Sequence, residues 1–217
     1  MKNKKIDWPN HLIELVVVFI GITLAFMLNN WREDYTDQQM AEKYMNSFRS
    51  DIAYDHAQLD SIIQSNEDKL ERINLFIGSL KNKNSTIRDA ERIMGAMAEI
   101  NPFIPEINTY ESIKNSGSLN ILTDFEIKEK LIQYYQRLEG KKLIEQMNML
   151  YITNYIIPFI HENADFLNQR IINRNVVDNH NFSNLVLGYY QLLVQTIDYY
   201  KGIFELNNEL ELMMEKK

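Results

Sequence analysis

The sequence predicts an all-α protein in which an N-terminal transmembrane helix continues into an elongated antiparallel helical bundle. One apolar stretch near the N-terminus, Leu12 to Leu28, contains a single ionisable side chain, that of Glu14. Beyond this stretch, apolar residues recur at intervals of three and four, which is the spacing of one helix face. No part of the sequence alternates apolar and polar residues as a half-buried strand would.

The apolar stretch is expected to anchor the chain in a membrane. As a helix it is about 25 Å long, and Trp8 and Trp31, which lie on either side, are about 34 Å apart at a rise of 1.5 Å per residue. The hydrocarbon core of a bilayer is about 30 Å thick, and tryptophan is enriched at both of its interfaces. We therefore expect a tail over residues 1–11, an anchor over residues 12–30 and one bundle domain over residues 31–217.

The charges beside the anchor predict its orientation. Three lysines precede it, whereas one arginine and three acidic residues follow it: Lys2, Lys4, Lys5, Arg32, Glu33, Asp34 and Asp37. The positive-inside rule then puts the N-terminus in the cytoplasm and the bundle in the periplasm, as a single-pass inner-membrane protein with lipid as its first partner. A cleaved signal peptide is the alternative, because Thr23-Leu24-Ala25 loosely imitates a cleavage site.

Two features inside the anchor have a structural and a functional interpretation. Glu14 lies about one turn inside the anchor, where a carboxylate reaches headgroup water and favours the positive end of the helix dipole; the alternative is an intramembrane proton or ion site. Gly21 and Ala25 form a small-xxx-small pair, which lets two helices approach closely. We expect a weak homo-oligomer with its contacts between Gly21 and Lys43, and burial within the chain from Phe48 onward.

The first half of the domain is expected to be one long helix, from Trp31 to about Asn82, with Asp55 and Asn66 as polar interruptions of its apolar seam. After a polar turn, Thr86 caps a helix that ends near residue 99. The prolines in Asn101-Pro102-Phe103-Ile104-Pro105 then prevent a helix, so the chain crosses over in an extended form.

The second half contains several helix boundaries. A short helix over about residues 110–115 should stop at Gly117 in a left-handed conformation. Thr123 and Glu126 have the spacing of a capping box that starts a helix from Asp124, and Pro158 must kink or break this helix. Residues 159–172 should be helical again. Ser183, with Phe182 as a hydrophobic staple, should cap a last helix that runs to about Met214.

Two sequence blocks resemble a known family. The blocks HLIELVVVFIGITLAFMLNNWRED and NTYESIKNSGSLNILTDFEIKEKLIQYY are similar to a family of uncharacterised single-span membrane proteins from Bacteroidota, with patterns resembling EIxLVVxGIxIAxxxNNWxE and TYxxLxxSGxLxxIxDxxLxxxLxxYY. Phe26-Met27 departs from the first pattern. The resemblance implies a membrane topology but no activity. The residues on the two patterns are Glu14, Gly21, Asn29, Asn30 and Trp31, and then Thr109, Tyr110, Ser116, Gly117, Leu119, Asp124 and Tyr135.

Composition argues against several function classes. The net charge is −7 and no basic cluster lies outside the N-terminus, so a nucleic-acid partner is not expected. The chain has no cysteine, which excludes disulfides and thiolate metal sites. The four histidines are scattered, and the groupings Asp51-Asp55-His56 and His161-Glu162-Asp165 are typical of solvated helix faces, so we expect neither a metal nor a cofactor.

No motif of nucleophilic or phosphate chemistry is present in the sequence, and we do not expect an enzyme. The expected function is a membrane-anchored scaffold or interaction protein of the bacterial cell envelope, which assembles with itself or with another envelope protein. The alternatives are an extracytoplasmic ligand-sensing bundle that acts through a partner, and an enzyme with a dispersed site. Tyrosine pairs at residues 134–135, 189–190 and 199–200 are either core residues or the lining of a pocket between helices.

Overall fold

A computed structural model describes residues 8–165, 167–168 and 170–215, and the side chains of these residues from Leu12 onward. The N-terminal lysines and the side chain of Trp8 lie outside this description. The fold is all-α, as predicted. The described residues form six α-helices: α1 (Trp8–Lys81), α2 (Ile87–Ala98), α3 (Asn108–Asn115), α4 (Phe125–Tyr151), α5 (Ile157–Asn163) and α6 (His180–Glu215). Short elements connect them: the 3-10 helices η1 (Ser118–Ile121) and η3 (Val176–Asp178), the π-helix η2 (Ile152–Ile156), and the strands β1 (Ala164–Asp165) and β2 (Arg170–Ile171).

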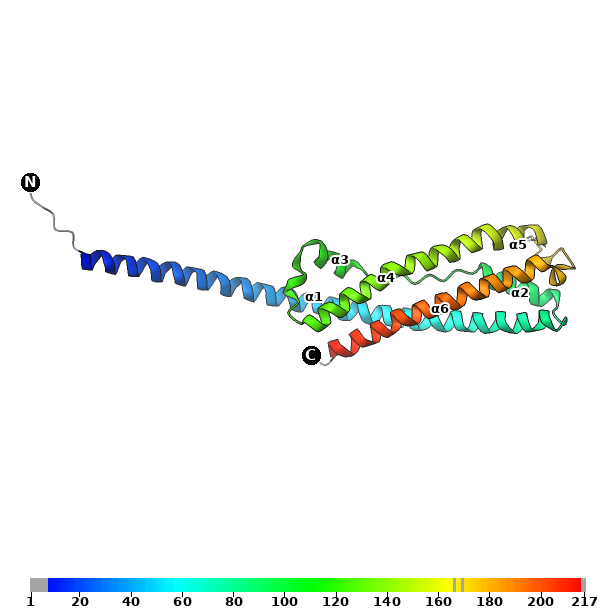
Figure 1. Cartoon of the computed structure of the whole chain (residues 1–217), viewed down its shortest axis with the longest axis horizontal. Helices are drawn as coiled ribbons and strands as arrows, with labels where there is room; N and C mark the ends of the chain where they lie inside the picture. Colours follow the sequence, from blue (N-terminus) through cyan, green and yellow to red (C-terminus); the bar gives the residue numbers. More distant parts are fainter. Residues whose placement is uncertain (1–7, 166, 169, 216–217) are drawn as a thin grey trace, which may run out of the picture.

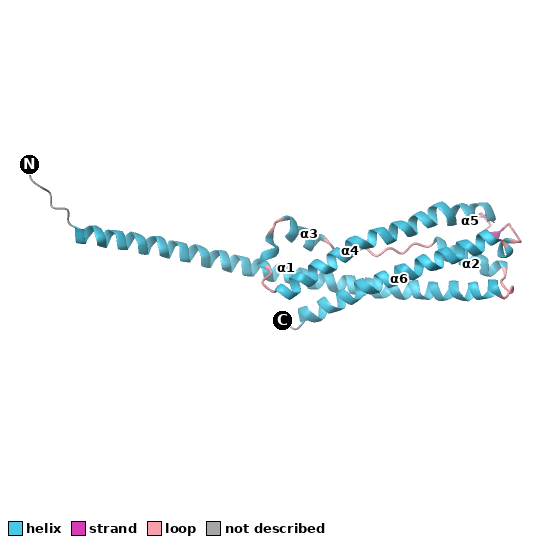
Figure 2. Cartoon of the chain, viewed as in Figure 1, coloured by secondary structure: helices cyan, strands magenta, loops and turns pink. Residues whose placement is uncertain are grey.

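The bundle is elongated, and α1 runs along its whole length and projects beyond one end (Figure 1). The chain returns through α2, an extended segment (residues 99–107) and α3, goes out again along α4 and α5, and returns along α6, which packs against both α1 and α4. Figure 2 shows the extended segment as a loop between α2 and α3. Two short helices and an extended segment therefore take the place that a fourth long helix has in a regular bundle.

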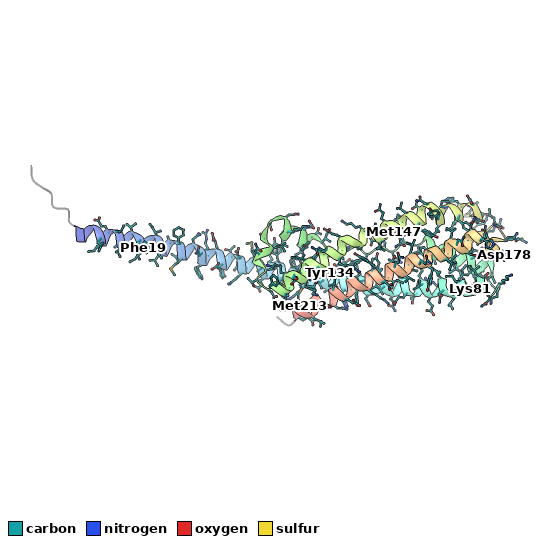
Figure 3. The ribbon with its side chains drawn as sticks, in the orientation of Figure 1. Phe19, Lys81, Tyr134, Met147, Asp178 and Met213 are labelled. Carbon is teal, nitrogen blue, oxygen red and sulfur yellow. The ribbon has the colours of Figure 1, made fainter. Side chains whose placement is uncertain are left out.

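Helix α1 has two parts with different surroundings. All side chains from Leu12 to Met40 are exposed, and this part projects from the bundle, as the label of Phe19 in Figure 3 shows. The described part of the chain contains one helix long and apolar enough to cross a membrane, and it is the N-terminal part of α1. Phe48 is the first buried residue of α1, which confirms the prediction that burial within the chain begins at Phe48.

The core consists of two hydrophobic clusters. The near cluster lies at the end from which α1 projects and includes Phe48, Leu131 and Ile203; the far cluster includes Ile73 and Phe182. All five side chains are completely buried, and a fully buried aliphatic or aromatic side chain contributes about 1.5 to 3 kcal/mol through the hydrophobic effect. The two clusters together hold α1, α4 and α6 side by side.

Two predicted boundaries are confirmed and one is wrong. Thr86 and Asp89 form a capping box at α2, and Gly117 has φ of 70°, in the left-handed region that glycine adopts without strain. Thr123 does not cap α4. The cap is Asp124, whose Oδ1 accepts a hydrogen bond from the backbone N–H of Ile127 at 3.1 Å, and Glu126 lies in the first turn, where a carboxylate favours the helix dipole.

The predicted break near Pro158 takes the form of η2. The N–H of Ile157 donates to the carbonyl of Ile152, five residues earlier, and this wider turn comes directly before the proline that cannot donate. The predicted helix over residues 159–172 is wrong beyond Asn163. There the chain forms a small antiparallel hairpin in which β1 pairs with β2.

The prediction that Ser183 caps the last helix is also wrong. Helix α6 starts three residues earlier, at His180, and Oδ1 of Asn179 accepts a hydrogen bond from the N–H of Asn181 at 2.8 Å. The predicted staple residue, Phe182, lies in the core, where its ring stacks on that of Phe159 at 5.5 Å between centroids.

Two glycines allow α4 and α6 to approach each other by a reciprocal contact. The hydroxyl of Tyr199 on α6 donates to the carbonyl of Arg137 beside Gly140, and the hydroxyl of Tyr151 on α4 donates to the carbonyl of Leu185 beside Gly188. A Cβ atom at either glycine would collide with the tyrosine hydroxyl. Both glycines thus have a packing reason to lie inside helices, where glycine is otherwise unfavourable.

Candidate functional site

Side chains from the helices hold the extended segment, because it has neither helical nor sheet hydrogen bonds of its own. At its α2 end, Lys69 Nζ donates to the carbonyl of Glu99 at 3.0 Å. In its middle, Lys141 Nζ donates to the carbonyl of Phe103 at 2.8 Å. At its α3 end, Asp55 Oδ1 accepts from the N–H of Glu106 at 2.9 Å. The segment is therefore fixed by charged side chains that lie in the interior of the bundle.

The Asp55 cluster (Asp51, Asp55, Tyr134 and Asn207) lies in the near half of the bundle. Asp55 is completely buried, and its second carboxylate oxygen accepts from the hydroxyl of Tyr134 at 2.7 Å. Asn207 Nδ2 donates to the carbonyl of Ile52 at 3.0 Å. Burial raises the pKa of Asp55 to about 6 and also raises that of Asp51, so both carboxyls favour the protonated form more than an exposed aspartate does.

A second charged group, in the middle of the bundle, is tightly paired. Lys141 Nζ lies 2.9 Å from both carboxylate oxygens of Glu145, and the hydroxyl of Tyr200 donates to Glu145 Oε1 at 2.7 Å. Lys141 is buried, and its three N–H groups point to three acceptors. This pair holds α4 against the extended segment.

A pocket of about 350 Å³, the mid-bundle pocket, lies beside this pair and between the two hydrophobic clusters. Residues of α1, the extended segment, α4 and α6 line it. This volume is at the lower end of the range for small-molecule sites. Its charged and amide or hydroxyl lining residues are Asn66, Lys69, Glu99, Asn101, Glu145, Gln146, Asn148 and Thr196. Its apolar and aromatic lining includes Pro102, Met149, Ile152, Tyr189, Leu193 and Tyr200.

Lys69 and Asn66 of the mid-bundle pocket are buried but incompletely paired. Lys69 is 2% exposed, and its nearest carboxylate oxygen, on Glu99, is 3.8 Å away on a side chain that is 55% exposed. Burial lowers the pKa of Lys69, which means that the site disfavours its charge. Asn66 is 5% exposed, and its amide has no hydrogen-bond partner in the part of the chain that the structure describes. Both side chains come from the same face of α1, three residues apart.

Asn66 differs from the other unpaired polar atoms of the bundle. Asp51 Oδ2 and Asn207 Oδ1 are fully enclosed acceptors without a donor among the described residues. Asn66 instead lines the mid-bundle pocket, where a bound molecule could supply its partner. Asn148 Nδ2 donates to Thr196 Oγ1 at 2.6 Å, so these two lining side chains are paired with each other, whereas Asn66 and Lys69 are buried and incompletely paired.

The residues that the sequence singled out lie elsewhere. The anchor set, from Glu14 to Trp31, lies on the projecting part of α1, where the side chain of Asn29 donates to Glu33 at 3.1 Å. The second set lies at the near end, on α3, in the following turn and at the start of α4: Thr109, Tyr110, Ser116, Gly117, Leu119, Thr123, Asp124 and Glu126. None of them lines the mid-bundle pocket. Tyr110 stacks on Tyr135 at 4.1 Å between ring centroids, in keeping with a structural role.

Sequence reasoning missed most of the pocket. Asn66 stood out as a polar interruption of the seam, and Lys69 is three residues further along the same helix face, but the partners that enclose them come from distant segments. Of the tyrosine pairs, Tyr134 and Tyr135 are core residues, while Tyr189 and Tyr200 line the pocket. The interpretation as core residues therefore holds for one pair, and the interpretation as pocket lining holds for one member of each of the other two.

The described residues define a helical-bundle protein with one helix long and apolar enough to cross a membrane and with a partly polar pocket between α1, the extended segment, α4 and α6. Residues 14–192 match DUF6090, a family of unknown function, and the chain belongs to this family. No curated protein and no solved structure gave a significant match. The matched region includes Asn66, Lys69 and Tyr189 but ends before Thr196 and Tyr200, and membership assigns no activity.

Proposed function

We propose that this chain is a membrane-anchored scaffold or interaction protein of the bacterial cell envelope, with a cytoplasmic N-terminus and a periplasmic bundle. The observation that carries the proposal is the continuity of α1. One helix of 74 residues joins the apolar stretch to the core of the bundle without a break. The positive-inside distribution of charges supports the orientation.

The exposed part of α1 also sets a distance between membrane and bundle. From Trp31 to Tyr44, the first partly buried tyrosine of α1, the helix is about 20 Å long at 1.5 Å per residue. Side chains from Trp31 to Met40 are all exposed. The bundle is thus presented away from the bilayer on a stiff rod, an arrangement suited to meeting other envelope components.

Labelling of single cysteines tests the topology, because the chain has none of its own. Asn84→Cys lies in the exposed turn after α1, and Asn3→Cys lies before the anchor. In intact spheroplasts, a membrane-impermeant maleimide should label Asn84→Cys and should reach Asn3→Cys only after permeabilisation. The reverse pattern would refute the orientation, and a mature chain beginning near Phe26 would refute the anchor.

Self-association is the second part of this proposal. The described part of α1 from Leu12 to Met40 has no cover from the bundle, and no atom lies within 4 Å of a Cβ placed at Gly21. We propose a weak homo-oligomer with contacts between Gly21 and Lys43. Cysteines introduced singly at positions 21, 25, 32 and 36 should cross-link in membranes with a helical pattern, and cross-links absent at all four positions would contradict it.

A second candidate function is ligand sensing through a partner protein, and the mid-bundle pocket favours it. Two of its lining residues, Asn66 and Lys69, belong to α1, the same helix that carries the apolar stretch. A ligand bound there would contact the helix that leads to the membrane. In both candidates the protein acts by binding and not by catalysis.

A further inference from the structure

The mid-bundle pocket contains two buried donors on one wall and an apolar opposite side. Asn66 and Lys69 are three residues apart on α1, and residues at this spacing are neighbours on one helix face. Both are more than nine-tenths buried and both line the pocket. A pair of adjacent N–H donors matches the two oxygens of a carboxylate.

Lys69 is the buried charged side chain of the pocket that lacks a close counter-charge. The charge of Glu145 is neutralised by Lys141, whose Nζ lies 2.9 Å from both carboxylate oxygens, and the hydroxyl of Tyr200 donates to Glu145 Oε1 at 2.7 Å. Lys69 has only the carbonyl of Glu99 at 3.0 Å and the Glu99 carboxylate at 3.8 Å, beyond hydrogen-bond distance. A buried ammonium is costly unless a close counter-charge accompanies it. The Glu99 side chain is mostly exposed and can turn away, so a ligand carboxylate can take the closer position.

The rest of the lining is suited to an apolar body. Ile152 and Leu193 are buried at the pocket wall, the rings of Tyr189 and Tyr200 lie beside them, and Met149 is 47% exposed. Methionine adapts to ligands of different shape. The π-helix η2 starts at Ile152, and such turns occur frequently at functional sites.

We propose that the mid-bundle pocket binds a small amphipathic carboxylate, whose head group is held by Lys69 and Asn66 and whose apolar part lies against Ile152, Leu193 and Tyr189. The head group replaces the long ion pair of Lys69 with a direct one and gives the Asn66 amide its partner. This inference goes beyond the scaffold function and does not depend on which side of the membrane the bundle occupies.

Equilibrium dialysis of radiolabelled octanoate against the full chain in lipid nanodiscs tests the proposal, with empty nanodiscs as the blank. Saturable binding at one site per chain is expected for the unmodified protein. Lys69→Met and Asn66→Leu should each weaken binding at least tenfold. Lys201→Met is the matched control, because Lys201 is exposed, pairs with Glu67 and does not line the pocket, and it should bind as the unmodified protein does.

Octylamine, which has the same chain and the opposite charge, should not bind saturably. Circular dichroism of each variant separates lost binding from lost folding, and Asn66→Leu is expected to fold at least as stably as the unmodified chain. Absence of saturable octanoate binding, equal binding by folded Lys69→Met, or equal binding of octylamine would each overturn the proposal. None of these results would bear on the cysteine-labelling test of topology.

Discussion

The Asp55 cluster and the mid-bundle pocket both place polar residues of α1 against the extended segment, yet they differ in how those residues are paired. Both oxygens of Asp55 accept short hydrogen bonds, at 2.9 and 2.7 Å. In the pocket, Lys69 reaches its carboxylate only at 3.8 Å, and Asn66 has no partner among the described residues. The same contrast separates two buried lysines, because Lys141 has two close carboxylate contacts and Lys69 has none. We conclude that the cluster and the Lys141 pair serve the fold, whereas Asn66, and Lys69 beyond its one bond to the extended segment, are available to a ligand.

Among the substitutions considered, Asp55→Leu should cause the largest loss in the free energy of unfolding. The substitution leaves the N–H of Glu106 and the hydroxyl of Tyr134 without their acceptor, and each unpaired buried group costs about 1 to 3 kcal/mol. Urea unfolding followed by circular dichroism should show a loss of about 3 kcal/mol. A loss below about 1 kcal/mol would mean that the cluster does not hold the extended segment.

Lys141→Met should cost less, about 2 kcal/mol, because Glu145 keeps its bond from Tyr200 and reaches solvent at the pocket. Lys69→Met, measured in the same way, should cost clearly less than Lys141→Met, since Lys69 has the weaker pairing. Equal losses in the free energy of unfolding for the two variants would contradict the distinction between Lys141, which serves the fold, and Lys69, which is open to a ligand.

The raised pKa of Asp55 should be visible in the pH dependence of the free energy of unfolding. Its pKa is raised from 3.8 to about 6 in the fold, so between these values the folded chain binds more protons than the unfolded one. The stability contributed by this group is therefore complete below about pH 4 and is lost as the pH rises through about 6. Relative to Asp55→Asn, the Tm of the unmodified chain should fall by roughly a few degrees over this range. A difference in Tm that stays constant from pH 4 to pH 7.5 would contradict the raised pKa.

Local rules predicted the parts of the fold that local interactions decide. The cap at Thr86, the left-handed Gly117 and the long α1 all depend on residues close in sequence. The wrong boundaries arose where two candidates lie close together in the sequence: Thr123 is next to Asp124, and Ser183 is four residues after Asn179. At α6, packing of Phe182 on Phe159 accompanies the earlier start, and this contact is not visible in the sequence.

The pocket could not be predicted because its walls come from four separate segments. Asn66 is evident in the sequence as a polar residue on an apolar seam and Lys69 was not singled out, but a buried polar residue is normally paired. Only the structure shows that Lys141 and Asp55 are paired and that Asn66 is not. The pairing of β1 with β2 was not predicted because each strand has two residues, too few for a pattern of alternation.

The unfolding free energy of Asn66→Leu tests the central distinction most directly. The side-chain amide of Asn66 lines the pocket and has no hydrogen-bond partner among the described residues, so an apolar side chain of similar size breaks no hydrogen bond and adds contacts with the pocket wall. We predict that the variant is more stable than the unmodified chain by about 1 kcal/mol in urea unfolding, while it loses octanoate binding. A variant less stable by about 1 kcal/mol or more would show that Asn66 serves the fold in the same way as Asp55, and would contradict the account.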